Sequence, residues 1–95
     1  MTSIAATTEF LKARTDVELV ASAIAGGESG FEELVRRYQR PIVSYVYRML
    51  NDYESALDVT QEVFIKVYNS LERYSAEYKF STWLYRIAHN AAIDH

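Results

Sequence analysis

The 95-residue sequence has no cysteine, one proline, three glycines and no long apolar run. Without cysteine, a disulfide scaffold and any thiolate metal or redox site are excluded. The short apolar runs exclude a membrane-spanning helix, and residues 1–14 lack the basic start and apolar stretch of an export signal. The glycines, all between residues 26 and 30, form no glycine-rich loop for a phosphate. We therefore expect a cytoplasmic protein.

The sequence does have a large apolar fraction and segregated charge. With 49% hydrophobic and 24% charged residues, it is typical of one packed domain and not of a disordered tail. Its net charge of −3 divides into −4 over residues 1–35, +4 over 36–50, −4 over 51–72 and +1 over 73–95. Such blocks fit different partners on different faces, although solvated helix faces give the same pattern. A domain that grips duplex DNA mainly by neutralising phosphates would be basic overall.

All periodicity in the sequence is helical. The first helix is expected to start at Thr15, which has capping-box spacing to Glu18, and to end at Gly26-Gly27. Its expected apolar stripe is Val17, Val20, Ala21 and Ile24. A second capping box at Ser29 and Glu32 predicts the next helix, with a kink at Pro41. The stripe of that helix is Phe31, Leu34, Val35, Tyr38, Ile42, Tyr45, Val46 and Met49.

Two further helices complete the expected fold. Asn51-Asp52 closes the second helix and caps the third, which has the inner stripe Ala56, Val59, Val63, Val67 and Leu71. Residues 72–80 read as a loop, and Ser81 is expected to cap a last helix with the inner face Trp83, Leu84, Ile87, Ala88 and Ala91. No segment alternates with period two. We therefore expect an all-α bundle of about four helices over residues 15–95, with an ordered loop before the last helix and a flexible segment at residues 1–14.

Catalytic and metal-binding patterns are weak. His89 and His95, with Asp94, form the only near-cluster of possible ligands, and neither histidine has a helical glutamate partner at metal-ligand spacing. The carboxylates lie on helix faces that the pattern predicts to be exposed to solvent. We expect no enzymatic activity, no metal and no cofactor.

The informative stretch runs from Arg73 to Asn90. Aromatic rings beside cations in a loop offer faces on which unstacked bases stack and positive charge for the nucleic-acid backbone. Alternatively, Phe80 and Trp83 close the end of the bundle and the tyrosines lie flat on it. A polar face on the last helix, formed by Arg86, His89 and Asn90, extends the candidate surface. The whole candidate surface consists of Arg73, Tyr74, Tyr78, Lys79, Phe80, Trp83, Arg86, His89 and Asn90.

A second candidate surface lies on the third helix. Phe64, Ile65 and Tyr68 cannot all join its inner stripe, because the apolar arc would then pass nearly round the helix. Apolar surface therefore remains beside Asp58, Gln61 and Glu62, and such a mixed face suits a protein partner with a basic helix. A helix buried on two sides of the bundle explains the same pattern.

Two motifs in these stretches resemble the second conserved region of bacterial sigma factors, and the closest similarity is to the extracytoplasmic-function (ECF) group. Asp58–Phe64 reads Asp-Val-Thr-Gln-Glu-Val-Phe, and Tyr78–Ala88 reads Tyr-Lys-Phe-Ser-Thr-Trp-Leu-Tyr-Arg-Ile-Ala. Phe31–Tyr38 and Arg48–Leu50 fit the same pattern in order and spacing. The resemblance covers Asp16 to His95.

The resemblance implies that the chain binds core RNA polymerase and recognises the promoter minus-ten element. One helix would dock on the clamp helices of the largest polymerase subunit through Asp58, Gln61, Glu62 and Ile65. The loop and last helix would capture a base flipped from the non-template single strand, because Tyr78, Phe80, Thr82 and Trp83 match that segment, with Arg86 and Asn90 extending the contact. Anti-sigma factors commonly bind this group. The helix-turn-helix half of such factors is absent, so the chain alone should not direct full promoter recognition. Because the helical pattern of the last helix continues to His95 without a stop signal, we expect a fragment.

A second hypothesis comes from a different class of function. The chain would be a helical adaptor with a sigma-like fold that binds only protein and has no DNA recognition. The two hypotheses differ at the aromatic loop, because only the first requires sequence-dependent binding of single-stranded DNA there.

Overall fold

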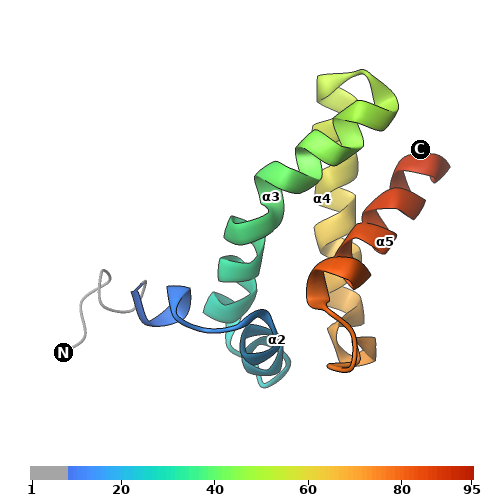
Figure 1. The fold of residues 1–95 in the computed structure, drawn as a ribbon. Helices are drawn as coiled ribbons and strands as arrows, with labels where there is room; N and C mark the ends of the chain where they lie inside the picture. Colours follow the sequence, from blue (N-terminus) through green and yellow to red (C-terminus); the bar gives the residue numbers. More distant parts are fainter. Residues whose placement is uncertain (1–8) are drawn as a thin grey trace.

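The computed structural model describes residues 9–95, and over that range it contains helices, turns and no strand. The elements are α2 (Asp16–Ile24), α3 (Glu28–Leu50), α4 (Tyr53–Ser70), the 3₁₀ turn η1 (Leu71–Arg73) and α5 (Phe80–Asp94). Figure 1 shows α3 and α4 as an antiparallel hairpin, with α5 packed along it and α2 at its lower end. This confirms the all-α bundle. Among the described residues, no helix is both long and apolar enough to cross a bilayer.

The start of α2 is as predicted, but its buried face is not. Thr15 and Glu18 form both hydrogen bonds of the capping box, and Gly26 has a positive φ of 99°. The expected stripe is wrong, because its members Val17, Ala21 and Ile24 are exposed; Val20 is buried together with Leu19. The cause is the close crossing of α2 over the start of α3. A Cβ added to Gly30 would lie 3.0 Å from the carbonyl oxygen of Leu19, so the Leu19 side of α2 faces α3.

Helix α3 begins earlier than the sequence predicts. Its N-cap is Gly27 and its first residue is Glu28, so Ser29 lies inside the helix and the second capping box is wrong. The N–H of Gly27 donates to the carbonyl oxygen of Ser22 over 2.9 Å, and this tight turn sets where α3 starts. The helix runs through Pro41 without a break, and its direction changes near the middle (Figure 1).

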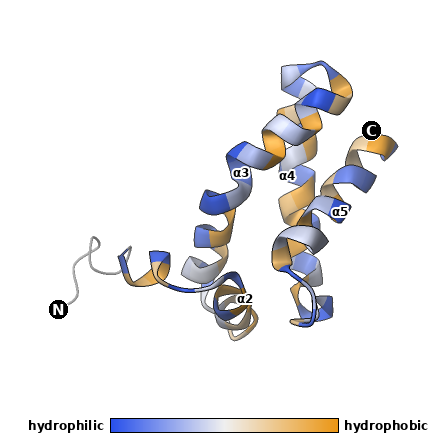
Figure 2. Cartoon of the chain, viewed as in Figure 1, coloured by the Kyte–Doolittle hydropathy of each residue, from blue (hydrophilic) through white to orange (hydrophobic). Residues whose placement is uncertain are grey.

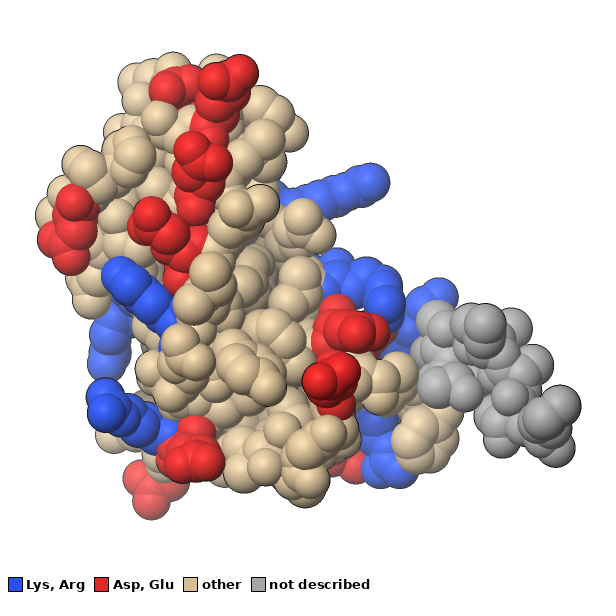
Figure 3. All heavy atoms as spheres, turned by 180° about the vertical axis from the view of Figure 1, so that it is seen from behind, with Lys and Arg blue, Asp and Glu red and all other residues tan. Residues whose placement is uncertain are grey.

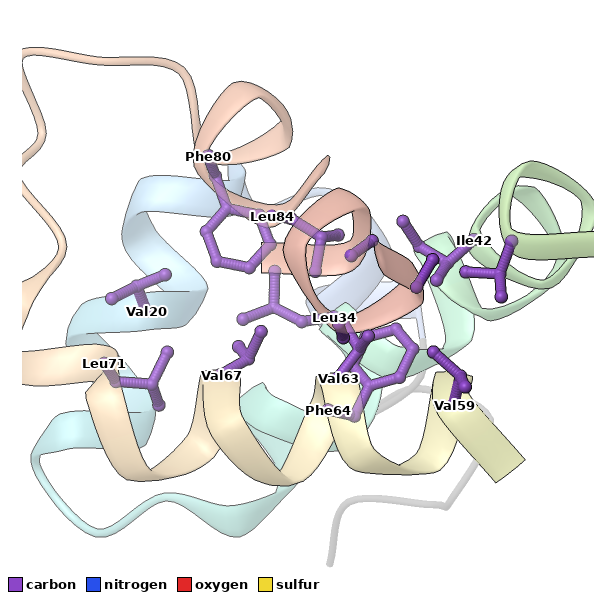
Figure 4. Close-up of a cluster of buried hydrophobic side chains, with 14 of the residues drawn as sticks. Val20, Leu34, Ile42, Val59, Val63, Phe64, Val67, Leu71, Phe80 and Leu84 are labelled. Atoms are coloured by element: carbon purple, nitrogen blue, oxygen red, sulfur yellow. The ribbon is translucent and has the colours of Figure 1, made fainter. Parts of the chain in front are cut away.

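The core lies between α3, α4 and α5, with α2 closing one end (Figure 4). Every residue of the stripe expected for α4 is buried, and Asn51 closes α3 in the left-handed conformation with φ 56°. From the α3 stripe, Leu34, Ile42 and Val46 are buried but Met49 is exposed. Figure 2 shows apolar residues gathered where the helices face one another.

Helix α5 also starts earlier than expected, by two residues. Its N-cap is Lys79 and its first residue is Phe80, so the prediction of Ser81 as the cap is wrong. Phe80 is buried against the core (Figure 4), and this burial fixes the position at which the helix begins. Leu84, Ala88 and Ala91 are buried as predicted, with Ala92 in addition.

The segment before α2 is attached to α3. Residues 9–12 are helical, and the Arg37 guanidinium donates hydrogen bonds to the main-chain carbonyls of Leu11, Lys12 and Arg14. The expectation of flexibility over residues 1–14 falls in part on residues 1–8, which lie outside the described residues.

Candidate nucleic-acid and protein interfaces

A pocket opens between η1, the following loop and the first turns of α5. Its volume is about 360 Å³, and its lining consists of aromatic rings, guanidinium groups and hydroxyls: Arg73, Tyr74, Ser75, Tyr78, Thr82, Trp83 and Arg86. The Tyr78 side chain is the most open of these rings, with 65% of the residue exposed. The stretch from Arg73 to Arg86, which the sequence singled out, therefore forms a concave surface of the size and chemistry that hold a nucleobase.

Tyr74 and Trp83 form the inner wall of this pocket. Their rings are tilted against each other with centroids 5.4 Å apart, and both are partly buried against the core. Burial, together with the negative charge of Asp16, raises the pKa of the Tyr74 phenol. The phenol therefore keeps its proton and remains a hydrogen-bond donor at neutral pH.

Phe80 lies beneath the pocket and not in it. It is only 2% exposed, and its ring centroid lies 5.6 Å from that of Tyr74, 5.8 Å from that of Trp83 and 5.7 Å from that of Tyr38. In this conformation its ring cannot meet a nucleotide, so the structure agrees with the alternative in which Phe80 closes the end of the bundle. Its contribution to the pocket is to support the rings that line it.

The other residues named from the sequence lie around the pocket. Lys79 lines a second hollow of about 380 Å³ on the α2 side of the loop, together with Thr15 and Asp16. His89 and Asn90 are exposed further along α5, and the His89 ring is hydrogen-bonded to the Tyr45 hydroxyl of α3 over 2.9 Å. The candidate residues thus divide into a compact group at the pocket and outlying positions on either side.

A partly buried ion-pair network lies next to the aromatic cluster, and the sequence analysis did not predict it. Arg37 donates to Asp16 over 3.0 Å and to Glu33 over 3.1 Å, and Tyr38 also donates to Asp16. Glu33 is 3% exposed. Its burial acts to raise the pKa of the carboxyl, but hydrogen bonds from Arg36 and Arg37 outweigh this and hold that pKa below its ordinary value. The network fixes α2 and the segment before it on α3.

The second candidate surface is an exposed stripe on α4. Asp58, Gln61, Glu62 and Ile65 are all exposed at spacings that place them on one side of the helix. Ile65 is 61% exposed. Figure 3 shows acidic side chains gathered over the upper half of the back of the molecule, the half that contains the turn between α3 and α4. An apolar side chain within an acidic surface suits a partner that is both apolar and basic.

The apolar surface beside this stripe is partly open, as expected. Phe64 joins the core, whereas Ile65 and Tyr68 stay exposed, so α4 is not buried on two sides. Gln61, Phe64 and Ile65 line a groove of about 400 Å³ between α3 and α4. Within residues 9–95, no three His, Cys, Asp or Glu side chains come together as a metal site.

The chain is similar in sequence to proteins named as RNA polymerase sigma factors. Residues 34–95 match the family described as Sigma-70 region 2. The chain is 40% identical over 86 residues to the RNA polymerase sigma-H factor of Pseudomonas aeruginosa, a match that covers 90% of this chain and 45% of that protein. It is 42% identical over 69 residues to the ECF RNA polymerase sigma factor SigW of Bacillus subtilis, covering 73% of this chain and 37% of that protein. The chain thus spans less than half the length of these relatives.

A solved structure has the same fold. It is the NMR structure of an engineered region 2 of sigmaE in complex with GTAAAA. The match has a TM-score of 0.79 and 43% sequence identity, and it covers 85% of this chain and 84% of that one.

Proposed function

Since this chain belongs to the Sigma-70 region 2 family, with ECF sigma factors among its relatives, we propose that it is the part of such a factor that recognises the promoter minus-ten element and docks on core RNA polymerase. It is a transcription initiation factor without catalytic activity of its own, requires no cofactor, and acts in the cytoplasm. Two separate surfaces support the proposal, one for each partner.

The pocket between η1 and α5 is the observation that carries the proposal for DNA. Its rings and hydroxyls support binding of a base extruded from the non-template strand, and Arg73 and Arg86 in its lining supply positive charge for the adjoining phosphates. Binding there favours strand opening, because stacking of about 1–3 kcal/mol per base offsets the few kcal/mol that unstacking costs. The likeness to a region 2 that binds GTAAAA supports this assignment.

The exposed stripe on α4 supports the second half of the proposal. Asp58, Gln61 and Glu62 offer acceptors and negative charge around the apolar Ile65, and the proposed occupant is the pair of clamp helices of the largest polymerase subunit. Docking there explains how a domain of net charge −3 acts on DNA, because the polymerase supplies most of the affinity and this domain supplies the discrimination. An anti-sigma factor that covers either surface is a third expected partner.

The proposal is tested with single-stranded DNA. The 95-residue chain is immobilised and used to select from DNA with a randomised six-nucleotide core, with GTAAAA as a fixed reference sequence. We expect enrichment of a defined hexamer and a Kd that rises when single bases of that hexamer are changed. Retention without any sequence preference would contradict DNA recognition and favour the protein-binding adaptor.

A further inference from the structure

The loop after η1 is closed by hydrogen bonds that neither motif predicts. The Tyr74 hydroxyl donates to the main-chain carbonyl oxygen of Tyr78. The N–H of Tyr78 donates to the carbonyl oxygen of Ser75 over 3.1 Å, and the N–H of Glu77 donates to the Ser75 hydroxyl over 3.4 Å. These bonds fold residues 74–78 into a compact turn, with the exposed ring of Tyr78 at its far end.

The ring of Tyr74 fixes this turn to the core. It meets Phe80 edge to face with centroids 5.6 Å apart and lies against Trp83 at 5.4 Å. Phe80 in turn is buried. The core therefore holds the ring of Tyr74, while the Tyr74 hydroxyl holds the main chain of Tyr78, four residues further along in an exposed segment.

We infer that Tyr74 is a positioning residue, whose hydroxyl holds Tyr78 in the conformation that receives a base. The inference rests on the proposed function and assigns a positioning role to the Tyr74 hydroxyl. If the loop were free, its residues would have to be ordered when DNA binds, and that loss of conformational entropy would lower the affinity. A turn already closed by the Tyr74 hydroxyl avoids this loss.

The test removes the hydroxyl and keeps the ring. In Tyr74→Phe, the contacts with Phe80 and Trp83 remain, but the bond to the Tyr78 carbonyl is lost. Trp83 is the only tryptophan in the chain and lies in the pocket wall, so its fluorescence reports occupancy directly. Titration uses the tightest-binding hexamer from the selection above, with GTAAAA as reference. We expect Kd to rise roughly 2- to 12-fold, the range that one hydrogen bond supports.

A second measurement separates positioning from general stability. Hydrogen exchange at the Tyr78 N–H is expected to be faster in Tyr74→Phe, while Tm stays equal to that of Tyr53→Phe. Tyr53 is a matched control, because it is exposed at the start of α4, outside both proposed surfaces.

Two results would overturn the positioning role. One is an unchanged Kd and unchanged Tyr78 exchange in Tyr74→Phe, which would leave DNA recognition standing without this role. The other is a higher Kd in Tyr74→Phe together with a Tm below that of Tyr53→Phe, which would assign the hydroxyl to overall stability. If the unsubstituted chain itself shows no sequence preference, the proposed function fails, and the exchange measurement still reports whether Tyr74 closes the loop.

Discussion

Tyr78 is the ring of the proposed DNA pocket on which we expect base capture to depend most directly. Its residue is 65% exposed, so truncation removes little core packing but takes away the outermost ring of the pocket. For Tyr78→Ala, we expect the Kd for the selected single-stranded hexamer to rise about 5- to 150-fold, because one base–aromatic stack contributes about 1–3 kcal/mol. Fluorescence anisotropy of the labelled hexamer measures it. Tyr53→Ala is the control, and equal binding by the Tyr78 variant would place the DNA elsewhere.

Arg37 is a polar residue whose loss should lower the stability of the fold. Its guanidinium is the shared donor for Asp16, Glu33 and three main-chain carbonyls. In Arg37→Ala the buried Glu33 carboxylate keeps only Arg36, and we expect a loss of about 2–4 kcal/mol in the free energy of unfolding, measured by urea denaturation. Arg37→Lys should recover part of the loss, since lysine restores the charge but not the fork of donors. Arg40→Ala, on the exposed side of α3, should change stability little.

The same variant has a defined pH dependence. The pKa of Glu33 is lowered from its ordinary value of 4.5, so its ionised form stabilises the fold above that pH and the contribution is lost as the pH falls through the lowered pKa. The stability difference between the unsubstituted chain and Arg37→Ala should therefore shrink as the pH falls from 7 to about 3. A difference that stays constant over this range would show that the ion pairs contribute little.

At the residue scale, the sequence predicts which side chains gather but not which way each one turns. The loop and the start of α5 carry four aromatic residues that the sequence does not distinguish, namely Tyr74, Tyr78, Phe80 and Trp83. In the structure Phe80 is buried, whereas Tyr78 is open to solvent. Asp16 and Arg37 are 21 positions apart, and nothing in their local spacing predicts that they pair. Both outcomes depend on how α2 and α5 dock on α3, which is a long-range property.

At the scale of the elements, the start of a helix is predicted correctly only where residues close together in sequence determine it. Thr15 and Glu18 satisfy each other, and the expected start is correct. The capping box expected at Ser29 is wrong, because packing at Gly27 makes α3 start earlier. The cap expected at Ser81 is also wrong, because burial of Phe80 makes α5 start earlier. For α4, where burial follows a regular period, the complete inner stripe is predicted.

The crossing of α2 over α3 is the element contact that is most sensitive to a single atom. At Gly30 an added Cβ would meet the carbonyl oxygen of Leu19 at 3.0 Å and the hydroxyl of Ser22 at 3.2 Å. Gly30→Ala should therefore destabilise the fold by about 1–3 kcal/mol through overpacking, although alanine favours an exposed helix by about 1 kcal/mol. The measurement is Tm, with an expected fall of at least about 4 °C.

Ser29→Ala provides the comparison for this prediction. Ser29 is the neighbouring residue of the same helix turn and is exposed, so its replacement should leave Tm unchanged or slightly higher. A Gly30 variant as stable as the Ser29 variant would mean that the two helices separate without cost.

At the scale of the whole molecule, the two proposed surfaces share no lining residue. We therefore expect that substitutions can abolish binding of one partner without affecting binding of the other. The groove beside the α4 stripe contains Gln61 and Ile65, whereas the pocket is built from η1, the loop and α5. For Gln61→Ala combined with Glu62→Ala, we expect retention by core RNA polymerase in a pull-down to fall roughly tenfold. Binding of the single-stranded hexamer should not change.

Tyr53→Ala serves as the control for the polymerase surface. Tyr53 is exposed at the start of the same helix and lies outside the stripe, and its replacement should leave retention intact. Equal retention of the double variant and this control would remove the stripe as the docking surface.

For the molecule as a whole, the motifs were enough to predict the helical class and the family, since both depend on residues that recur at fixed spacing. The concave shape of the pocket was not predictable in this way. It depends on the Tyr74–Tyr78 hydrogen bond and on the burial of Phe80, which arise only after the helices have packed.

The short turn between α3 and α4 has a consequence for how the chain reaches its native state. Asn51 and Asp52 alone join the two longest helices, so much of the core forms between segments that are adjacent in sequence. Low contact order of this kind is associated with folding times of microseconds to milliseconds. We expect the hairpin to form early in a newly made chain, with α2 and α5 docking on it afterwards.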